Sequence, residues 1–265
     1  MSDTIAPVRV RARARTIRLS PMPDPDSVRV LHLDEDTLVL FKPSGMLVHR
    51  GWGKADLVLV DCAREYTQGG LAHPIQRLDR GASGPVLFAR SAQAARRLSQ
   101  WAEQGDCRKR YLALVRGLTP ESLEIDHPMT RRVDGPELAA RTEFRRVASV
   151  DTDPRTVSLI DVSPLTGRLH QIRRHLKHAN HPLIGDVNYG RGDLNRAFRA
   201  CYGLNRLALH AWQWKVENQA SDICLGGIVP IPKDFELPLA KMGFDLTEIY
   251  NYLSGHPPCQ RRSNI

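Results

Sequence analysis

Cysteines are few in this sequence, and they are not arranged to hold a metal or a disulfide framework. The 265 residues include five cysteines, an odd number, and no two of them form a C-x-x-C pair. Such spacing argues against a thiolate metal site and against a set of structural disulfides, and it is typical of a reducing compartment. The sequence therefore indicates a cytoplasmic protein.

Long apolar runs are also missing. No window has the roughly 18 consecutive apolar residues that a membrane-spanning helix needs. The basic N-terminal segment is not followed by the apolar core of a secretory signal. We therefore expect neither membrane insertion nor secretion.

Several catalytic motifs are absent. The sequence contains no G-x-x-x-x-G-K-[ST], no G-x-G-x-x-G and no G-x-S-x-G, so nucleotide-cofactor enzymes and serine hydrolases have no support. A cluster of four histidines (His170, His175, His178 and His181) could suggest a metal, but its arginine and lysine neighbours would repel a dication. A polar face that meets phosphates is therefore the better interpretation of this cluster than a metal site.

Positive charge is what the chain has in excess. Lys and Arg number 38 against 29 Asp and Glu, a net charge of +9 with a pI near 9.6. Such an excess favours polyanionic partners, with nucleic acid first and an anionic membrane second. Five arginines near the N-terminus contribute to it: Arg9, Arg11, Arg13, Arg15 and Arg18. We expect residues 1–27 to form a disordered basic arm and residues 256–265 a C-terminal tail.

The segment between them, residues 28–255, is expected to form one folded domain. Apolar patterning predicts strands over 28–33, 38–41, 85–89, 110–117, 156–164 and 206–216, and helices over 56–66, 91–105 and 169–180. In the second helix Ser91 is the expected N-cap, Ala94, Leu98 and Trp101 form the apolar stripe, and Gly105 is the stop. Asp56 is the expected cap of the first helix. Without strict βαβ alternation, an α/β or α+β fold around a mixed sheet is expected.

Three polar clusters stand out: IQRLDRGASG (75–84), KRYLALVRG (109–117) and TGRLHQIRRH (166–175). Taken alone, the first is better explained as a solvated salt-bridge turn than as a carboxylate in a cationic surround, and Tyr111 of the second as a half-buried strand residue. In the helix over 169–180, with Ile172, Leu176 and Ala179 inward and Asn180 as its end, Arg173 falls on a flank. A flanking arginine could reach a carboxylate of another segment, such as Asp79, and keep it ionised. Gly81 and Gly84 would let the backbone around Asp79 turn tightly.

Taken together and in this order, the clusters resemble the RluA family of pseudouridine synthases. The residues that carry the resemblance are KPSGMLVHRG (42–51), RLDRGASG (77–84), KRYLALVRG (109–117), TGRLHQIRRHLKHANHPLIGDVNYG (166–190) and RLALHA (206–211). A finer similarity is to the tRNA pseudouridine synthase C subfamily, carried by KPSGMLVHR, RRHLKHANHPLIGD and NRAFRACYGLNRLALHA (195–211). No segment resembles the small S4-type RNA-binding domain of some relatives.

The resemblance implies a pseudouridine synthase fold with a mainly antiparallel central sheet flanked by helices. It also implies an isomerase that converts uridine to pseudouridine in RNA without cofactor or metal. The subfamily's substrate is uridine 65 of tRNA. A site in large-subunit ribosomal RNA is the alternative within this class, and an RNA-binding protein or chaperone without turnover is the alternative outside it. We expect a cytoplasmic monomer.

The resemblance also assigns roles to single residues. Asp79 would be the catalytic aspartate, which either attacks the anomeric carbon of the ribose or removes the neighbouring ribose proton to give a glycal. Tyr111 would stack on the uracil and help to remove its C5 proton, and Arg173 would pair with Asp79 and hold it charged. Arg77 would fill the space left by the flipped-out uridine, and Leu209, with Leu207 as the alternative, would form the apolar wall.

Contacts to RNA are expected from the polar residues around these positions, chiefly with phosphates. They are Gln76, Arg80, Lys109, Arg110, Arg168, His170 and Arg174. Two positions depart from the family pattern: Gln76 stands where histidine is usual, and Ala82 stands where threonine is usual and loses a hydroxyl that could brace the loop. Pro85 is also unusual at a strand entry. None of these changes removes a residue assigned to chemistry, but they motivate the alternative without turnover.

Overall fold

The computed structural model describes residues 27–50, 57–67, 70–130 and 135–256. The chain divides into two compact units, Met1–Glu103 and Gln104–Ile265, and each is described by itself. Almost all of the predicted basic arm and C-terminal tail lies outside the described residues. The prediction that residues 28–255 act as one domain stays a prediction.

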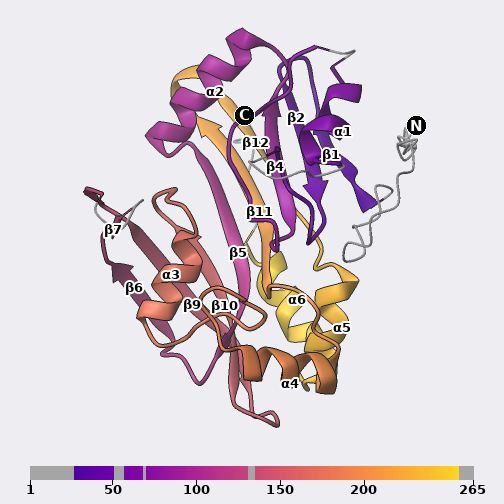
Figure 1. The fold of residues 1–265 in the computed structure, drawn as a ribbon. Helices are drawn as coiled ribbons and strands as arrows, with labels where there is room; N and C mark the ends of the chain where they lie inside the picture. The colour runs from indigo at the N-terminus through magenta and orange to yellow at the C-terminus, as the bar shows by residue number, and fades with distance from the viewer. Residues whose placement is uncertain (1–26, 51–56, 68–69, 131–134, 257–265) are drawn as a thin grey trace. The chain divides into compact units, whose positions relative to one another are not determined.

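The first unit is built on a four-stranded antiparallel sheet (Figure 1). The strand order is β1 (Arg29–Leu33), β2 (Thr37–Lys42), β4 (Gly84–Ala89) and β3 (His73–Pro74). Every residue of β2 and β4 is buried, which explains why both read as short continuous apolar runs. The strands predicted over 28–33, 38–41 and 85–89 are confirmed.

Helix α2 (Ala92–Gln104) follows the predicted pattern. The Oγ of Ser91 accepts a hydrogen bond from the backbone N–H of Ala94 at 3.1 Å, as an N-cap does. Ala94, Leu98 and Trp101 are buried, and Gly105 ends the helix with a φ of 86°.

Helix α1 (Leu59–Glu65) begins later than predicted. Val58 is its N-cap, and the backbone N–H of Val58 donates to the Asp61 carboxylate at 3.3 Å. The predicted start of this helix, with Asp56 as its cap, was therefore wrong. Asp56 itself lies outside the described residues.

The second unit contains a six-stranded antiparallel sheet and a short hairpin. The order in the sheet is β12 (Ile223–Ile228), β11 (Leu209–Asn218), β5 (Cys107–Arg116), β10 (Val157–Pro164), β9 (Arg141–Val150) and β6 (Ser122–Asp126), and the hairpin pairs β7 (Met129–Thr130) with β8 (Glu137–Leu138). All named strand pairs in the described part of the chain are antiparallel. The α+β class is confirmed, with antiparallel rather than mixed sheets.

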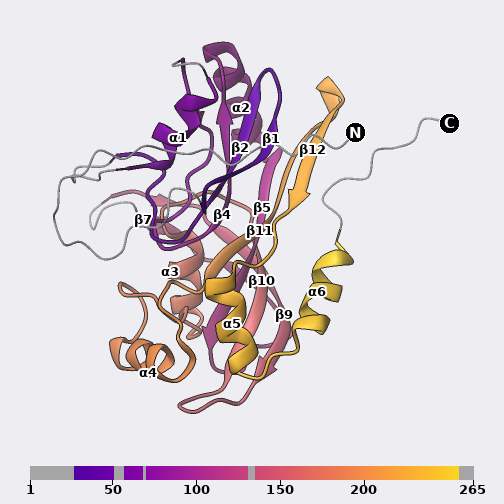
Figure 2. The same cartoon turned by 90° about the vertical axis from the view of Figure 1, so that its right-hand side faces the viewer.

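Three helices cover the core of this second unit (Figure 2). They are α4 (Gly192–Tyr202), α5 (Lys233–Lys241) and α6 (Leu246–Ser254); a short 3-10 turn, η2 (Gln219–Ser221), joins β11 to β12. Phe198, Phe235 and Ile249, one from each helix, pack with Trp212 of β11 and Leu112 of β5 in one buried cluster. The sequence analysis predicted none of these three helices.

Helix α3 (Gln171–His178) lies where a helix was expected over 169–180. Ile172 and Leu176 are buried, and Asn180, with a φ of 63°, follows its end. Arg173 and His175 are buried as well. The expectation of a flanking Arg173 was therefore wrong: its side chain lies inside the fold.

Two further expectations concern thiols and membranes. Cys62, Cys107 and Cys201 are free, whereas Cys224 forms a disulfide, which the sequence analysis did not predict. Among the described helices, none combines the length and the apolar character that a membrane crossing requires.

Candidate active site

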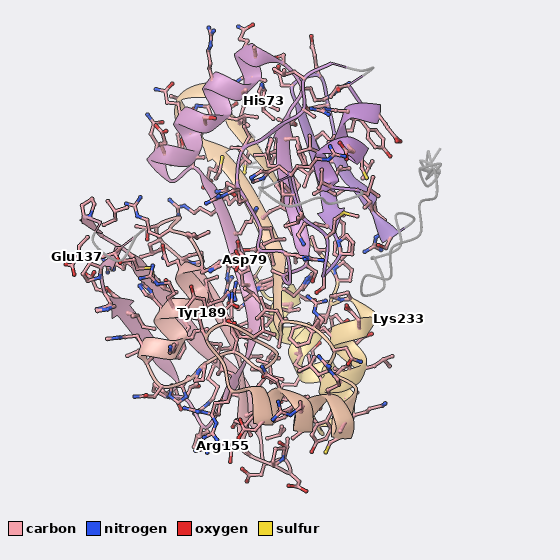
Figure 3. All side chains as sticks on the ribbon, in the orientation of Figure 1. His73, Asp79, Glu137, Arg155, Tyr189 and Lys233 are labelled. Carbon is pink, nitrogen blue, oxygen red and sulfur yellow. The ribbon has the colours of Figure 1, made fainter. Side chains whose placement is uncertain are left out.

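Asp79 lies on the loop between β3 and β4 of the first unit (Figure 3). Its carboxylate is half-buried, and its backbone carbonyl accepts a hydrogen bond from the N–H of Ala82 at 3.0 Å, which closes a tight turn. Gly84 at the end of the turn has a φ of 133°, a backbone conformation that favours glycine. The local sequence therefore presents one carboxylate on a short, closed turn.

The buried side chain of Lys42 supports this turn through hydrogen bonds to backbone carbonyls. The Nζ of Lys42 donates to the carbonyls of Arg80 at 3.2 Å and Ala82 at 2.6 Å, and also to those of Pro43 and Met46 at 2.9 Å each. Lys42 has no exposed surface. Backbone carbonyls that converge on one ammonium group hold the segment 42–46 against the Asp79 turn.

Two further contacts join the same segments. Ser44 Oγ donates to the carbonyl of Gly81 at 2.6 Å, while Gly45 and Arg80 exchange two hydrogen bonds. The loop thus has a bracing hydroxyl, but it comes from Ser44 and not from position 82. Ala82 is fully buried with its backbone groups bonded, so the departure from the family pattern leaves the turn supported.

Tyr111 lies on β5 in the second unit. Side chains of every second residue along a strand emerge on the same face of the sheet. Its partner in β11 is Ala211, and Leu209 lies opposite Ala113, so Tyr111 and Leu209 share one face of the sheet. Both side chains are buried. Leu207 precedes the strand, which favours Leu209 as the apolar neighbour of Tyr111.

Lys109 shares that face and is unusual there. Only 8% of its surface is exposed, and its Nζ has no hydrogen-bond partner in the described part of the structure. Burial lowers the pKa of Lys109 from its ordinary value of 10.5 to about 8. Lys109, which was expected to contact a phosphate, is therefore a buried amine two residues from Tyr111 and not a surface lysine.

Arg173 forms a buried bidentate ion pair that the sequence analysis did not foresee. Its Nε donates to Asp186 Oδ2 at 2.7 Å and its Nη2 to Asp186 Oδ1 at 2.9 Å. Burial alone would raise the pKa of Asp186, but the hydrogen bonds from Arg173 and the backbone amides outweigh it, and the pKa is lowered. Asp186 is ionised and holds Arg173 from one edge.

The geometry so far contains a carboxylate on a braced turn, an aromatic ring beside an aliphatic wall, and an oriented guanidinium. A family model described as RNA pseudouridylate synthase matches residues 36–178, more than half of the chain. The chain belongs to the RNA pseudouridylate synthase family. It is an isomerase that makes pseudouridine in RNA, as the resemblance implied.

Similar proteins cover most of this synthase. A protein of Haemophilus ducreyi named tRNA pseudouridine synthase C is 39% identical over 199 residues, which are 69% of this chain and 82% of that protein. One of the same name from Salmonella typhimurium is 36% identical over 203 residues, 69% of this chain and 78% of that protein. The solved structure of human RNA Pseudouridylate Synthase Domain Containing 1 has a TM-score of 0.67, 22% identity, and coverage of 88% of this chain and 97% of that one. It confirms the fold.

Arg110 of the synthase points to the opposite face of β5 from Lys109 and Tyr111. It forms an ion pair with the buried Asp161, which also accepts hydrogen bonds from Trp212 Nε1 and the Tyr252 hydroxyl at 3.0 Å each. Its guanidinium lies 4.9 Å from the centre of the Trp212 ring. This geometry gives Arg110 a structural role, and its expected phosphate contact stays a prediction.

The other expected RNA contacts lie in both units. Arg77 and Arg80 of the synthase are exposed beside Asp79, and Gln76 is half-buried. In the second unit Arg168 is exposed, with its Nε donating to the carbonyl of Ala139 at 3.0 Å. Asp79 and Arg173 belong to different units, so their pairing stays a prediction.

Arg174 and His170 lie on or beside α3. Arg174 Nη1 donates to the carbonyl of Thr130 at 2.9 Å, and the Nδ1 of His170 lies 3.1 Å from the Tyr189 hydroxyl. His170 precedes α3 with a φ of 53°, a conformation rare outside glycine. Non-glycine residues in this conformation concentrate at functional sites.

Of the four clustered histidines, only His175 is buried. His175 is buried, with Nδ1 2.8 Å from Thr142 Oγ1 and Nε2 3.0 Å from the carbonyl of His127. Burial lowers the pKa of His175. The rings of His127 and His178 stack with centroids 3.9 Å apart. Within the described ranges, no group of three or more His, Cys, Asp or Glu side chains is placed to bind a metal ion.

Sequence reasoning missed Lys42, Ser44 and Asp186 as functional residues. All three lie inside segments that carry the family resemblance, KPSGMLVHRG and HPLIGDVNYG, which was the available signal. Their partners are backbone carbonyls or residues distant in sequence, and neither is visible in a linear pattern.

Proposed function

We propose that this synthase acts on tRNA and isomerises uridine 65. The observation that carries this proposal is the similarity to proteins named tRNA pseudouridine synthase C, up to 39% identical over most of both chains. The segments KPSGMLVHR, RRHLKHANHPLIGD and NRAFRACYGLNRLALHA carry the same similarity. We propose that it works in the cytoplasm as a monomer.

The reaction needs a uridine that has left its helix, because the glycosidic bond is inaccessible inside a base stack. Arg77, exposed beside Asp79, fills the space that the nucleotide leaves. Asp79 then attacks the anomeric carbon or removes the neighbouring ribose proton, and the bond between that carbon and N1 breaks. The uracil turns and C5 bonds to the same carbon, which releases Asp79 from that carbon in the first route and returns the proton to the ribose in the second. C5 then loses its proton and N1 gains one, so no atom is gained or lost overall.

The remaining assigned residues orient the base and the carboxylate. Tyr111 stacks on the uracil and assists the removal of its C5 proton, and Leu209 on the same face forms the apolar wall. Arg173 pairs with Asp79 and holds it charged. Exposed arginines such as Arg80 and Arg168 bind phosphates.

A deletion strain tests the substrate directly. We expect carbodiimide primer extension on its RNA to show the loss of one pseudouridine, at position 65 of tRNA, and its return with the wild-type gene. Loss of a site in ribosomal RNA would contradict the tRNA assignment. If no pseudouridine disappears, the chain is better described as an RNA-binding relative without turnover.

The arginines of the N-terminal segment give a separate expectation about binding. Each phosphate contact contributes roughly 0.7–0.9 to the slope of log affinity against log salt concentration. Replacing Arg9, Arg11, Arg13, Arg15 and Arg18 with serine should weaken tRNA binding and flatten this slope. The single-turnover rate at saturating enzyme should not change. Filter binding from low to moderate salt measures the slope, with Arg155→Ser as a control for general loss of charge. An unchanged slope would mean that the arm does not touch RNA.

A further inference from the structure

We propose that Asp186 is a positioning residue of the synthase, which acts by holding the Arg173 guanidinium in one orientation. The inference rests on the proposed role of Arg173 and adds the residues that make this role possible. It is carried by a cluster within the second unit that joins α3 to the loop before α4.

Asp186 contacts Arg173 in the geometry that restricts a guanidinium most. Two parallel hydrogen bonds of 2.7 and 2.9 Å join the Nε–Nη2 edge to both carboxylate oxygens. The side chains are 8% and 1% exposed. A bidentate pair fixes the plane of the guanidinium as well as its distance. Any second group that binds Arg173 must therefore approach from the Nη1 side.

The carboxylate is itself immobilised by its own loop. Asp186 Oδ1 also accepts the backbone N–H groups of Asn188 at 2.9 Å and Tyr189 at 3.0 Å. Asn195 of α4 ties the loop further, because its side chain donates to the carbonyl of Asp186 and accepts from the N–H of Gly185. The anchor that orients Arg173 is thus fixed to α4.

The aromatic ring of Tyr189 also contacts Arg173. Its ring centre lies 5.0 Å from the Arg173 guanidinium, and its hydroxyl contacts His170, which precedes α3. Arg173 is held by a carboxylate at one edge and an aromatic face beside it, and both arise from the segment 186–189. The segment that directs Arg173 is therefore separate from the helix that carries it.

Stability alone does not account for this arrangement. A buried ion pair loses so much hydration that replacing it with apolar side chains is often neutral or stabilising. Such a pair on a proposed catalytic arginine is better explained by the need for a fixed direction. Misplacement of a reacting group by about 1 Å can lower a rate by about 100-fold.

A second arginine in the same unit provides a control for loss of charge, with a carboxylate that is 55% exposed where that of Asp186 is 1% exposed. Arg206 is also buried, donates to the Asp234 carboxylate at 2.7 Å and lies 5.4 Å from the Phe235 ring. It repeats the combination of arginine, carboxylate and aromatic ring at a different place in the same unit. Asp234→Asn therefore removes a similar charge without touching Arg173.

The experiment measures single-turnover pseudouridine formation and RNA affinity for four variants. We expect Asp186→Asn to lower the rate by roughly 10–100-fold and to leave the RNA dissociation constant within about threefold. Asp234→Asn should keep the wild-type rate. In a double-mutant cycle, Asp186→Asn should add little to the loss caused by Arg173→Lys, because lysine cannot form the bidentate pair.

Several outcomes would overturn the inference. A wild-type rate in Asp186→Asn, or a loss that multiplies in full with that of Arg173→Lys, would show that Asp186 does not act through Arg173. If Asp186→Asn fails to fold, Asp186→Glu keeps the charge but displaces the carboxylate, and an undiminished rate there would contradict the proposal equally. Failure of the proposed function is distinguishable, because the wild-type protein would then form no pseudouridine in tRNA.

Discussion

Replacing Asp79 with asparagine is expected to lower pseudouridine formation by about 10⁴-fold or more, the scale on which loss of an enzyme's nucleophile or base lowers its rate. The amide can neither attack the anomeric carbon nor remove a ribose proton, so both routes stop. Release of tritium from RNA labelled at uracil C5 measures the rate, because that hydrogen leaves in the reaction.

The same variant should bind RNA and unfold as the wild type does. Asp79 is half-buried, and asparagine keeps its shape, so the turn closed by Ala82 and braced by Lys42 is preserved. Glu35→Gln, at an exposed position of the same unit, controls for loss of one negative charge. Full activity of Asp79→Asn would remove Asp79 from the chemistry while leaving the family assignment intact.

The elements that were predicted correctly are those whose signals lie close together in the sequence. Helix α2 was predictable because its cap, its buried stripe and its glycine stop all lie within fifteen residues. Strands β2 and β4 were predictable because they are buried on both faces, which leaves a continuous apolar run. In each case the signal and the structure that it specifies are local.

Helices α4 and α5 were missed because their own sequences argue weakly for helices. Helix α5 contains Pro238 in its interior, and Leu237 beside it is 57% exposed. In α4 only Phe198 is buried. These helices form because Phe198 and Phe235 complete the core around Trp212, which is a tertiary effect that no periodicity reveals.

In the candidate site, too, local signals were predictable and contacts between distant residues were not. Asp79, Tyr111 and Arg173 were named from motifs, but their surroundings depend on partners far away in the chain. Arg173 was expected on a flank because helical geometry places it beside the inward stripe of Ile172 and Leu176 and not on it. Asp186, thirteen residues later, supplies the carboxylate that makes its burial possible. Lys42 is similar, since its partners are backbone carbonyls that the sequence does not distinguish.

Lys109 gives the second large expected effect, because it destabilises the fold. Its folded pKa, about 8, lies below the ordinary value of 10.5. Below pH 8 lysine is charged in both states and the full penalty of burial applies. Between pH 8 and 10.5 the unfolded chain holds more protons, so stability rises with pH. A difference of this size corresponds to about 3 kcal/mol.

We therefore expect Lys109→Met to raise the free energy of unfolding by about 3 kcal/mol at pH 7 and to have little effect near pH 10.5. Urea unfolding at the two pH values, followed by tryptophan fluorescence, measures the difference. Lys233→Met removes an exposed lysine and should change stability by less than about 0.5 kcal/mol. A Lys109→Met protein no more stable than wild type at pH 7 would show that the ammonium has a partner after all.

The more stable variant should also be the poorer enzyme. Lys109 shares one face of the sheet with Tyr111 and Leu209, the residues proposed to hold the uracil. Its amine has no hydrogen-bond partner among the residues that the structure describes. A buried cation that destabilises the free protein is explained if its partner is a group of the bound RNA. Proteins often have lower stability where function requires such a residue. We expect Lys109→Met to bind tRNA more weakly while unfolding at higher urea. Wild-type affinity and rate in that variant would exclude Lys109 from substrate binding.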